Sequence, residues 1–307
     1  PTHAKTTAIS WLLDWEHNAE EVESILNSRR GWSPDGTSGI SVRITPHLTE
    51  TSTQSIENQT GLSNEQSDLF FTLAAALQLL DRPDNIQARL NGPIRIFLNS
   101  RNYETWQTLS PEEKLRRVWR AWTEQTVYAS EVAHAVGKVE ATANFKIMRA
   151  IGARGMSMYS LGAEWCALRR FVTRALRGLP SQTWVSWPEF RKALFELHPN
   201  AAHMLHTNDQ WWFSSIVSNI RLDQMKYDDW QKATGAIITR IVTESSQWFG
   251  AVECDCAPSK SGGTINLRAI RITDVGQWLF GLGNDSDAKL PEHAKPKARE
   301  YLPIEWL

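Results

Sequence analysis

The sequence predicts a mainly α-helical fold with small β-hairpins, arranged as two similar modules joined by helices. Apolar residues recur at helical spacing in several segments, and short alternating runs lie between them. One pattern of helix, strand, hairpin, strand and short helix occurs twice, about 175 residues apart, which favours two copies of one small module.

The composition is that of a globular protein. The chain has 307 residues, of which 41% are apolar and 22% charged. No apolar run approaches the roughly 20 residues that span a bilayer, and no basic-then-apolar leader opens the sequence. Three cysteines are too few for a disulfide framework, and their odd number favours reduced thiols. We therefore expect a cytoplasmic protein that does not contact membranes.

Tryptophan is unusually frequent, with 15 residues in the chain. Its large ring fills core and interface volume. We interpret most of these residues as packing between helices and hairpins, with stacking on nucleic-acid bases as the alternative.

Charge is unevenly distributed, although the net charge is only −1. Residues 1–68 hold ten acidic and four basic residues, whereas residues 137–178 hold eight basic and two acidic residues. The basic block could contact phosphates. A solvated helix face, or an intramolecular partner for the acidic end, explains it equally well.

The first copy of the repeated pattern follows an N-terminal helical region. Residues 8–30 have helical spacing, Ile40–Thr45 alternates as a strand, and a polar loop leads to a helix that Ser67 or Asp68 could cap. Residues 92–109 then give a strand and a short helix. The next helix has a clear start, because Ser110 is a capping residue, Pro111 occupies the first helical position and Glu113 completes a capping box.

The second copy lies near the C-terminus. Residues 160–180 form an amphipathic helix, and a short strand and a further helix stopped before Pro199 follow. A long helix over residues 228–250 leads into a hairpin over 251–273. On its return strand, Ile265 and Leu267 alternate in one phase and Ile270 and Ile272 in the other, which predicts a β-bulge near Arg268 and Ala269. The predicted segments are 1–126 with the first module, a basic helical connector at 127–180, the second module at 181–283 and a polar tail at 284–307.

Three phrases carry a resemblance to a known family. In the second half, Trp230 opens a helix that ends in QWFGAV at Gln247–Val252, and RITDVGQWLFG follows at Arg271–Gly281. In the first half the phrase is RIFLNSRNYETWQTLSPEEKLRRVWRAW at Arg95–Trp122. With the order of elements, these phrases resemble tandem winged-helix domains and the helicase-associated region of bacterial relatives of the xeroderma pigmentosum B-type helicase N-terminal domain. The chain departs from the pattern at Pro199–Asp228, an apparent insertion.

The resemblance implies a non-enzymatic protein that binds DNA or acts as a docking module in a DNA-transaction or regulatory system. A winged helix places its third helix in the major groove and its hairpin against flanking backbone. The third helix would be Asp228–Trp248. The implied nucleic-acid contacts are Lys232, Thr239, Arg240, Lys260, Arg268 and Arg271. This basic set is thin and the helix unusually apolar, so the alternative is a scaffold whose winged-helix surfaces contact protein.

A metal-dependent enzyme is the third and most distant alternative. His198, His203 and His206 could join Cys254 and Cys256 around zinc, but a spacing of one residue between cysteines is uncommon in zinc sites. The two cysteines lie two residues apart on a strand, so their side chains share a face. The simpler interpretation is that both are small side chains on the buried or half-buried side of the hairpin. No phosphate-binding loop, dinucleotide fingerprint, nucleophile elbow or zinc-protease motif occurs. We expect no catalytic residues, no metal and no cofactor, and the sequence does not indicate the oligomeric state.

Overall fold

Two compact units make up the part of the chain that the computed structural model describes. Among the described residues, those up to 125 belong to unit 1 and those from 131 to 281 belong to unit 2. The described residues are 32–33, 47–48, 62–81, 97–125, 131–132, 145–149, 158–205, 210–257 and 266–281. The predicted N-terminal helix, the strand Ile40–Thr45 and the polar tail lie outside them.

The predicted class, mainly α with small β elements, is confirmed. Helices account for 57% of the described residues, and each sheet that these residues form is small and antiparallel. The four predicted segment boundaries stay predictions.

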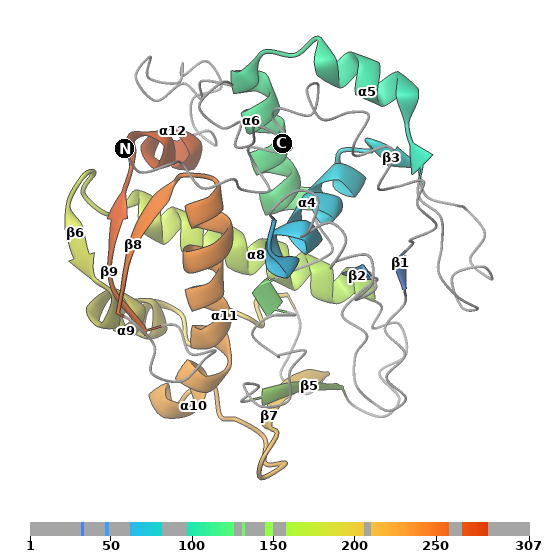
Figure 1. Ribbon diagram of the computed structural model, residues 1–307. Coiled ribbons are helices and arrows are strands. Elements are labelled where there is room, and N and C mark those ends of the chain that lie inside the picture. The colour runs from blue at the N-terminus through green and yellow to red at the C-terminus, as the bar shows by residue number, and fades with distance from the viewer. Residues whose placement is uncertain are drawn as a thin grey trace. The chain divides into compact units, whose positions relative to one another are not determined.

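Unit 1 is a set of short helices with two strand pairs (Figure 1). Its helices and strands are β1 (Trp32–Ser33), β2 (His47–Leu48), α4 (Asn64–Ala76), β3 (Leu80–Asp81), β4 (Phe97–Leu98), α5 (Ser100–Gln107), α6 (Pro111–Arg120) and the π-helical turn η2 (Ala121–Gln125). Strand β1 pairs with β2 and β3 with β4. Val118 and Trp122 are fully buried, so the α6–η2 segment supplies much of the core of this unit.

Helix starts in unit 1 test two predictions. Ser110 caps α6, because its side chain accepts a hydrogen bond from the backbone N–H of Glu113, and Pro111 occupies the first turn as predicted. The capping box is incomplete, since the Glu113 carboxylate accepts from Arg117 Nε at 3.0 Å, one turn further along. The prediction that Ser67 or Asp68 caps α4 is wrong. The cap is Ser63, whose side chain accepts from Gln66 N, and the helix begins at Asn64.

Unit 2 places a three-stranded sheet among its helices. Its elements are β5 (Phe145–Arg149), α8 (Met158–Arg177), β6 (Trp184–Ser186), α9 (Trp187–Leu197), β7 (Trp211–Ser215), α10 (Tyr227–Lys232), α11 (Thr234–Arg240), the π-helical turn η3 (Ile241–Ser246), β8 (Val252–Ala257), β9 (Asn266–Ile272) and α12 (Asp274–Gly281). In Figure 1, β9 lies between β6 and β8, and all three strands are antiparallel to their neighbours. Strands β5 and β7 form a separate pair.

The core of unit 2 lies between the sheet and its helices. Ile270 and Ile272 of β9 are fully buried, as are Leu168 and Val172 of α8 and Ile238 of α11. Burying aliphatic side chains of this size stabilises a fold by about 1.5–3 kcal/mol each. The same core holds Trp230 at 0% exposure, which confirms packing as the role of this tryptophan.

The long helix predicted over residues 228–250 is instead three consecutive pieces. The backbone breaks at Ala233, whose φ of −117° and ψ of −84° are not helical. Immediately after it, the Thr234 hydroxyl donates to the side-chain carbonyl of Gln224 at 2.6 Å. Beyond α11 the chain widens into η3, where the hydroxyl of Thr243 donates to the carbonyl of Thr239. Such hydroxyl bonds to the preceding turn bend helices. Helical periodicity did not reveal either feature.

Candidate nucleic-acid interface

The hairpin β8–β9 carries the predicted β-bulge. Asp255 pairs with Ala269, but the next residue, Cys256, pairs with Leu267, so that Arg268 is the extra residue. Leu267, Ile270 and Ile272 are buried on either side of it. The change of phase in the apolar pattern therefore located this bulge correctly.

Both arginines of the hairpin are paired with carboxylates on the neighbouring strand. Arg268 Nη2 lies 2.6 Å from Asp255 Oδ1, and this hydrogen bond raises the pKa of the Arg268 guanidinium. Arg271 donates to Glu253 through Nε, at 2.9 Å, and through Nη2. Its guanidinium also lies over the ring of Trp184 on β6, 5.0 Å from the centroid. Cross-strand acids thus balance the charge that the hairpin was expected to offer to phosphate.

The predicted DNA contacts on the helices also form hydrogen bonds or ion pairs with residues close to them in sequence. Lys232 Nζ lies 3.0 Å from Asp229 Oδ1, a hydrogen bond that lowers the pKa of the Asp229 carboxyl. Arg240 Nη1 lies 2.5 Å from Glu244 Oε1, whose side chain is only 6% exposed. Thr239 is buried, and its hydroxyl donates to the carbonyl of Gly235.

The structure therefore does not bring the six predicted DNA contacts together on one element. Arg268 and Arg271 share the hairpin, Lys232 lies on α10, and Thr239 and Arg240 lie on α11. Lys260 lies outside the described residues. The segment expected to enter a groove has Ile237, Ile238 and all of η3 buried, so its described surface is small. Each described cation of the set has a carboxylate within 3.0 Å.

A different basic surface lies on α8. Arg170, Arg174 and Arg177 are exposed and follow one another at intervals of four and three residues, which places them on one face of the helix. Arg170 and Arg174 make no ion pair with any described residue. We call these three side chains the arginine stripe. The excess of basic residues over 137–178 indicated this region, but the site prediction did not include it.

Not every arginine of that block is available. Arg169, next to the stripe in sequence, is 1% exposed and donates to Glu131 Oε2 at 2.8 Å. The Ser245 hydroxyl of η3 donates to the other oxygen of the same carboxylate. This buried contact holds α8 against η3 and contributes nothing to the surface charge.

The proposed metal ligands lie in different surroundings. His203 stacks on the Trp211 ring at 3.8 Å between centroids, and His198 packs edge-on against Phe171. Cys254 is half-buried with its thiol 3.9 Å from the Val242 carbonyl, whereas Cys256 is exposed near the end of β8, so the two cysteines do not share a buried face. His206 lies outside the described residues. Within the described ranges, no three His, Cys, Asp or Glu side chains gather in a way that could hold a metal ion.

Comparisons with protein families, with curated proteins and with solved structures find no match to this chain. None of the helices in the described ranges is both long enough and apolar enough to cross a bilayer.

Proposed function

We propose that unit 2 is a non-enzymatic, winged-helix-like binding module that holds DNA through the arginine stripe of α8. The order helix, strand, helix, helix, hairpin and the sheet order β6–β9–β8 support the winged-helix interpretation. In that interpretation α8 is the first helix, the α11–η3 segment is the third and β8–β9 is the wing. Unit 1 would be a second such module.

The observation that carries the proposal is that Arg170 and Arg174 are exposed and have no ion-pair partner within the described ranges of the chain. Arginine binds phosphate oxygens through a rigid fork of donors and is always charged. The stripe extends from Arg170 to Arg177, a rise of about 10 Å at 1.5 Å per residue, so it can contact more than one phosphate along a strand. Contacts of this kind position a protein on DNA without reading its sequence.

The stripe replaces the third helix and the wing as the expected contact surface. Almost every residue of α11 and η3 is buried, so this segment has little surface with which to enter a groove. Releasing Arg268 or Arg271 to phosphate would first break cross-strand ion pairs. Arg170 and Arg174 need neither change.

A salt titration tests this function. Fluorescence anisotropy with a labelled 20-base-pair duplex should give an affinity that falls steeply with salt, because each neutralised phosphate contributes about −0.9 to the slope of log K against log [salt]. Arg170→Ala with Arg174→Ala should lower the affinity about tenfold or more and make the slope shallower by roughly two contacts.

The matched control is Lys232→Ala with Arg268→Ala. It removes the same charge from two exposed side chains that are paired with acids. We expect the control to bind almost as the wild type does. If the control loses binding and the stripe variant does not, the contact surface is the wing. Absence of binding to any duplex or single strand would overturn the proposal.

A specific observation favours a protein-docking module as second candidate. The turn after β7 exposes three aliphatic side chains: Ile216 is 39% exposed, Val217 93% and Ile220 68%. Exposed apolar side chains that lie together are typical of interaction surfaces. A docking role predicts that Val217→Asp abolishes capture of a partner without changing the fold or the DNA affinity, whereas Val217→Thr weakens capture much less.

A further inference from the structure

A pocket of about 310 Å³ lies in unit 2 beside β7, within the segment that interrupts the winged-helix order. Trp212 and Phe213 of β7 line one part of it, and residues 221–224 line another. Its volume is at the lower end of the range of small-ligand sites. The pocket shares no residue with the arginine stripe or the hairpin β8–β9.

Flat rings surround the pocket. His203 stacks on Trp211 and meets Phe213 edge-on at 5.5 Å, which fixes both the imidazole and the phenyl ring. At the rim, the guanidinium of Arg221 lies 5.2 Å from the centroid of the Trp212 ring. Trp211 and Phe213 are fully buried and only support this wall, so the half-buried Trp212 ring is the aromatic face on which a planar ligand can stack.

Gln224 brings an unmatched hydrogen-bond donor to this pocket. Its side chain is 4% exposed, and its carbonyl accepts from the Thr234 hydroxyl at 2.6 Å. Its Nε2 has no hydrogen-bond partner in the part of the chain that the structure describes. A buried donor is costly to leave without a partner, so a ligand acceptor at this position would be favoured.

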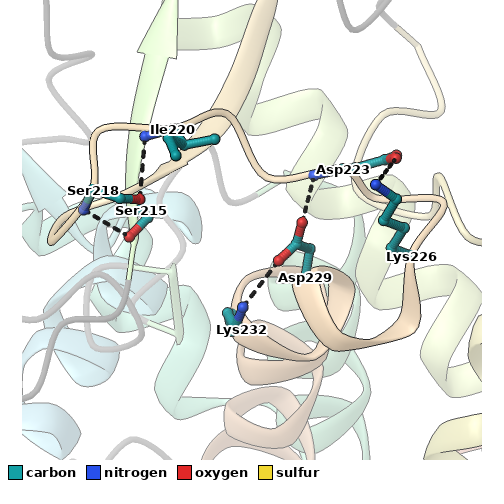
Figure 2. Close-up of polar contacts among 7 residues, drawn as sticks. All are labelled: Ser215, Ser218, Ile220, Asp223, Lys226, Asp229 and Lys232. Atoms are coloured by element: carbon teal, nitrogen blue, oxygen red, sulfur yellow. Dashed lines mark hydrogen bonds and ion pairs between the residues drawn. The ribbon is translucent and has the colours of Figure 1, made fainter.

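The segment that follows β7 is held by its own hydrogen bonds, as Figure 2 shows. The hydroxyl of Ser215 accepts from the N–H of Ser218, and the hydroxyl of Ser218 accepts from the N–H of Ile220. Further on, Asp229 accepts from the backbone N–H of Asp223 at 3.2 Å. The last of these bonds fixes the backbone of a lining residue, Asp223, so this part of the wall loses little conformational entropy when a ligand binds.

Charged residues at the rim of the pocket could also contact a ligand. Asp223 is a further lining residue, and its carboxylate accepts from Met225 N and lies 3.7 Å from Lys226. Arg221 adds an exposed cation. The pocket therefore offers the face of the Trp212 ring, a buried amide donor and a guanidinium. A nucleotide matches all three, through the face of its base, a base carbonyl and its phosphate.

We propose that this pocket binds a nucleotide, with the base on the Trp212 ring, Nε2 of Gln224 on a base acceptor and Arg221 on the phosphate. The nucleotide would be either an unpaired residue of a nucleic-acid strand or a free mononucleotide. In the first form the inference rests on the proposed function, because the arginine stripe would hold the strand and the pocket would take one of its bases. Base capture of this kind is sequence-tolerant, since every base has a flat face.

The test compares three probes: a labelled ten-residue oligothymidylate, a strand of the same length whose central residues are abasic, and free thymidine monophosphate. Anisotropy measures binding of the strands, and saturation-transfer NMR measures binding of the mononucleotide.

We expect the strand with bases to bind at least fivefold more tightly than the abasic strand. Gln224→Leu and Arg221→Gln should each remove most of this preference. Arg221 is exposed, so its variant keeps the fold even if the Gln224 variant does not, and circular dichroism checks both.

The outcomes separate the two proposals. Equal affinity for the two strands, together with no mononucleotide signal, overturns the pocket proposal even if DNA binds. If no strand binds, the proposed function fails, and a mononucleotide signal that Arg221→Gln removes still supports the pocket as a free-nucleotide site. A base preference that survives both pocket variants also overturns it.

Discussion

The guanidinium of Arg169 donates to the carboxylate of Glu131 at 2.8 Å, and both side chains are about 1% exposed. The same carboxylate accepts from the Ser245 hydroxyl, so one buried group connects residues from three parts of unit 2. Arg169 and Arg170 are neighbours in the sequence of α8, but their side chains differ in role. One is internal, and the other faces solvent.

Removing one member of this pair should destabilise unit 2 severely. Glu131→Gln leaves the Arg169 charge buried without its counter-ion, a loss that typically costs about 3–5 kcal/mol. We expect a fall of that size in the free energy of unfolding, measured by urea denaturation. Replacing both residues together, as Glu131→Leu with Arg169→Met, should cost much less, because no buried charge is left.

The exposed pair Lys192–Glu196 on α9 is the control. Its atoms lie 3.7 Å apart with side chains more than 60% exposed, and Lys192→Ala should change the stability by less than about 0.5 kcal/mol. If Glu131→Gln is as mild as this control, the buried pair does not hold the unit together.

Close packing at Gly276 predicts a second large effect. A Cβ atom at this position in α12 would lie 2.1 Å from the carbonyl oxygen of Ala251, a backbone atom that cannot rotate away. Gly276→Ala should therefore shift the backbone and cost about 1–3 kcal/mol or more in urea denaturation. Gly281 in the same helix is the matched control, because a Cβ there meets nothing within 4 Å. Gly281→Ala should be neutral or slightly stabilising, and equal losses at both glycines would contradict the packing argument.

The sequence located features whose causes are local. Ser110 and Pro111 mark the start of α6 because capping depends on a few consecutive residues. The bulge at Arg268 was predictable because side chains alternate strictly between the two faces of a regular strand, so a change of apolar phase requires an extra residue.

Features fixed by distant residues were not predictable. Periodicity joined α10, α11 and η3 into one helix, because nothing in that segment reveals the side chain of Gln224 beside Thr234. The basic set of the proposed interface was chosen by position in a motif, and the partners of its two hairpin arginines lie on the neighbouring strand. Arg271 and Glu253 are 18 residues apart, and only the register of the hairpin brings them together.

Cysteine reactivity should follow burial along β8. Burial raises the pKa of the Cys254 thiol to about 12, with smaller contributions from Cys256 and Glu253. At pH 8.5 the thiolate, which is the reactive form, is therefore very scarce at Cys254. In variants that keep a single cysteine, iodoacetamide should modify Cys254 at least tenfold more slowly than exposed Cys256. In urea the two rates should become similar, and equal rates in the folded protein would show that Cys254 is not buried.

The same shift predicts a loss of stability at alkaline pH. An unfolded thiol ionises near its ordinary pKa of 9.0, whereas folded Cys254 keeps its proton up to about pH 12. Between these values the unfolded state binds fewer protons than the folded state, so stability falls as pH rises. Cys254→Ala should reduce this decline in urea denaturation between pH 8 and 10.5. An identical pH profile in the variant would contradict the assignment.

The two arginines of the hairpin should respond differently to lysine. Arg271 donates two hydrogen bonds to Glu253 and lies over Trp184, and lysine can reproduce neither the fork nor the flat stacking surface. Arg268 makes one ion pair with Asp255 and is 59% exposed, so solvent screens most of its attraction. We expect Arg271→Lys to lower the free energy of unfolding by about 1 kcal/mol and Arg268→Lys to change it much less. Added 0.5 M NaCl should shrink the coupling between Arg268 and Asp255 in a double-mutant cycle, but it should leave the stacking contribution of Arg271 on Trp184 largely intact. Equal losses for the two lysine variants would mean that Trp184 and the second hydrogen bond add nothing, and that both wing arginines are as available to phosphate as ordinary surface residues.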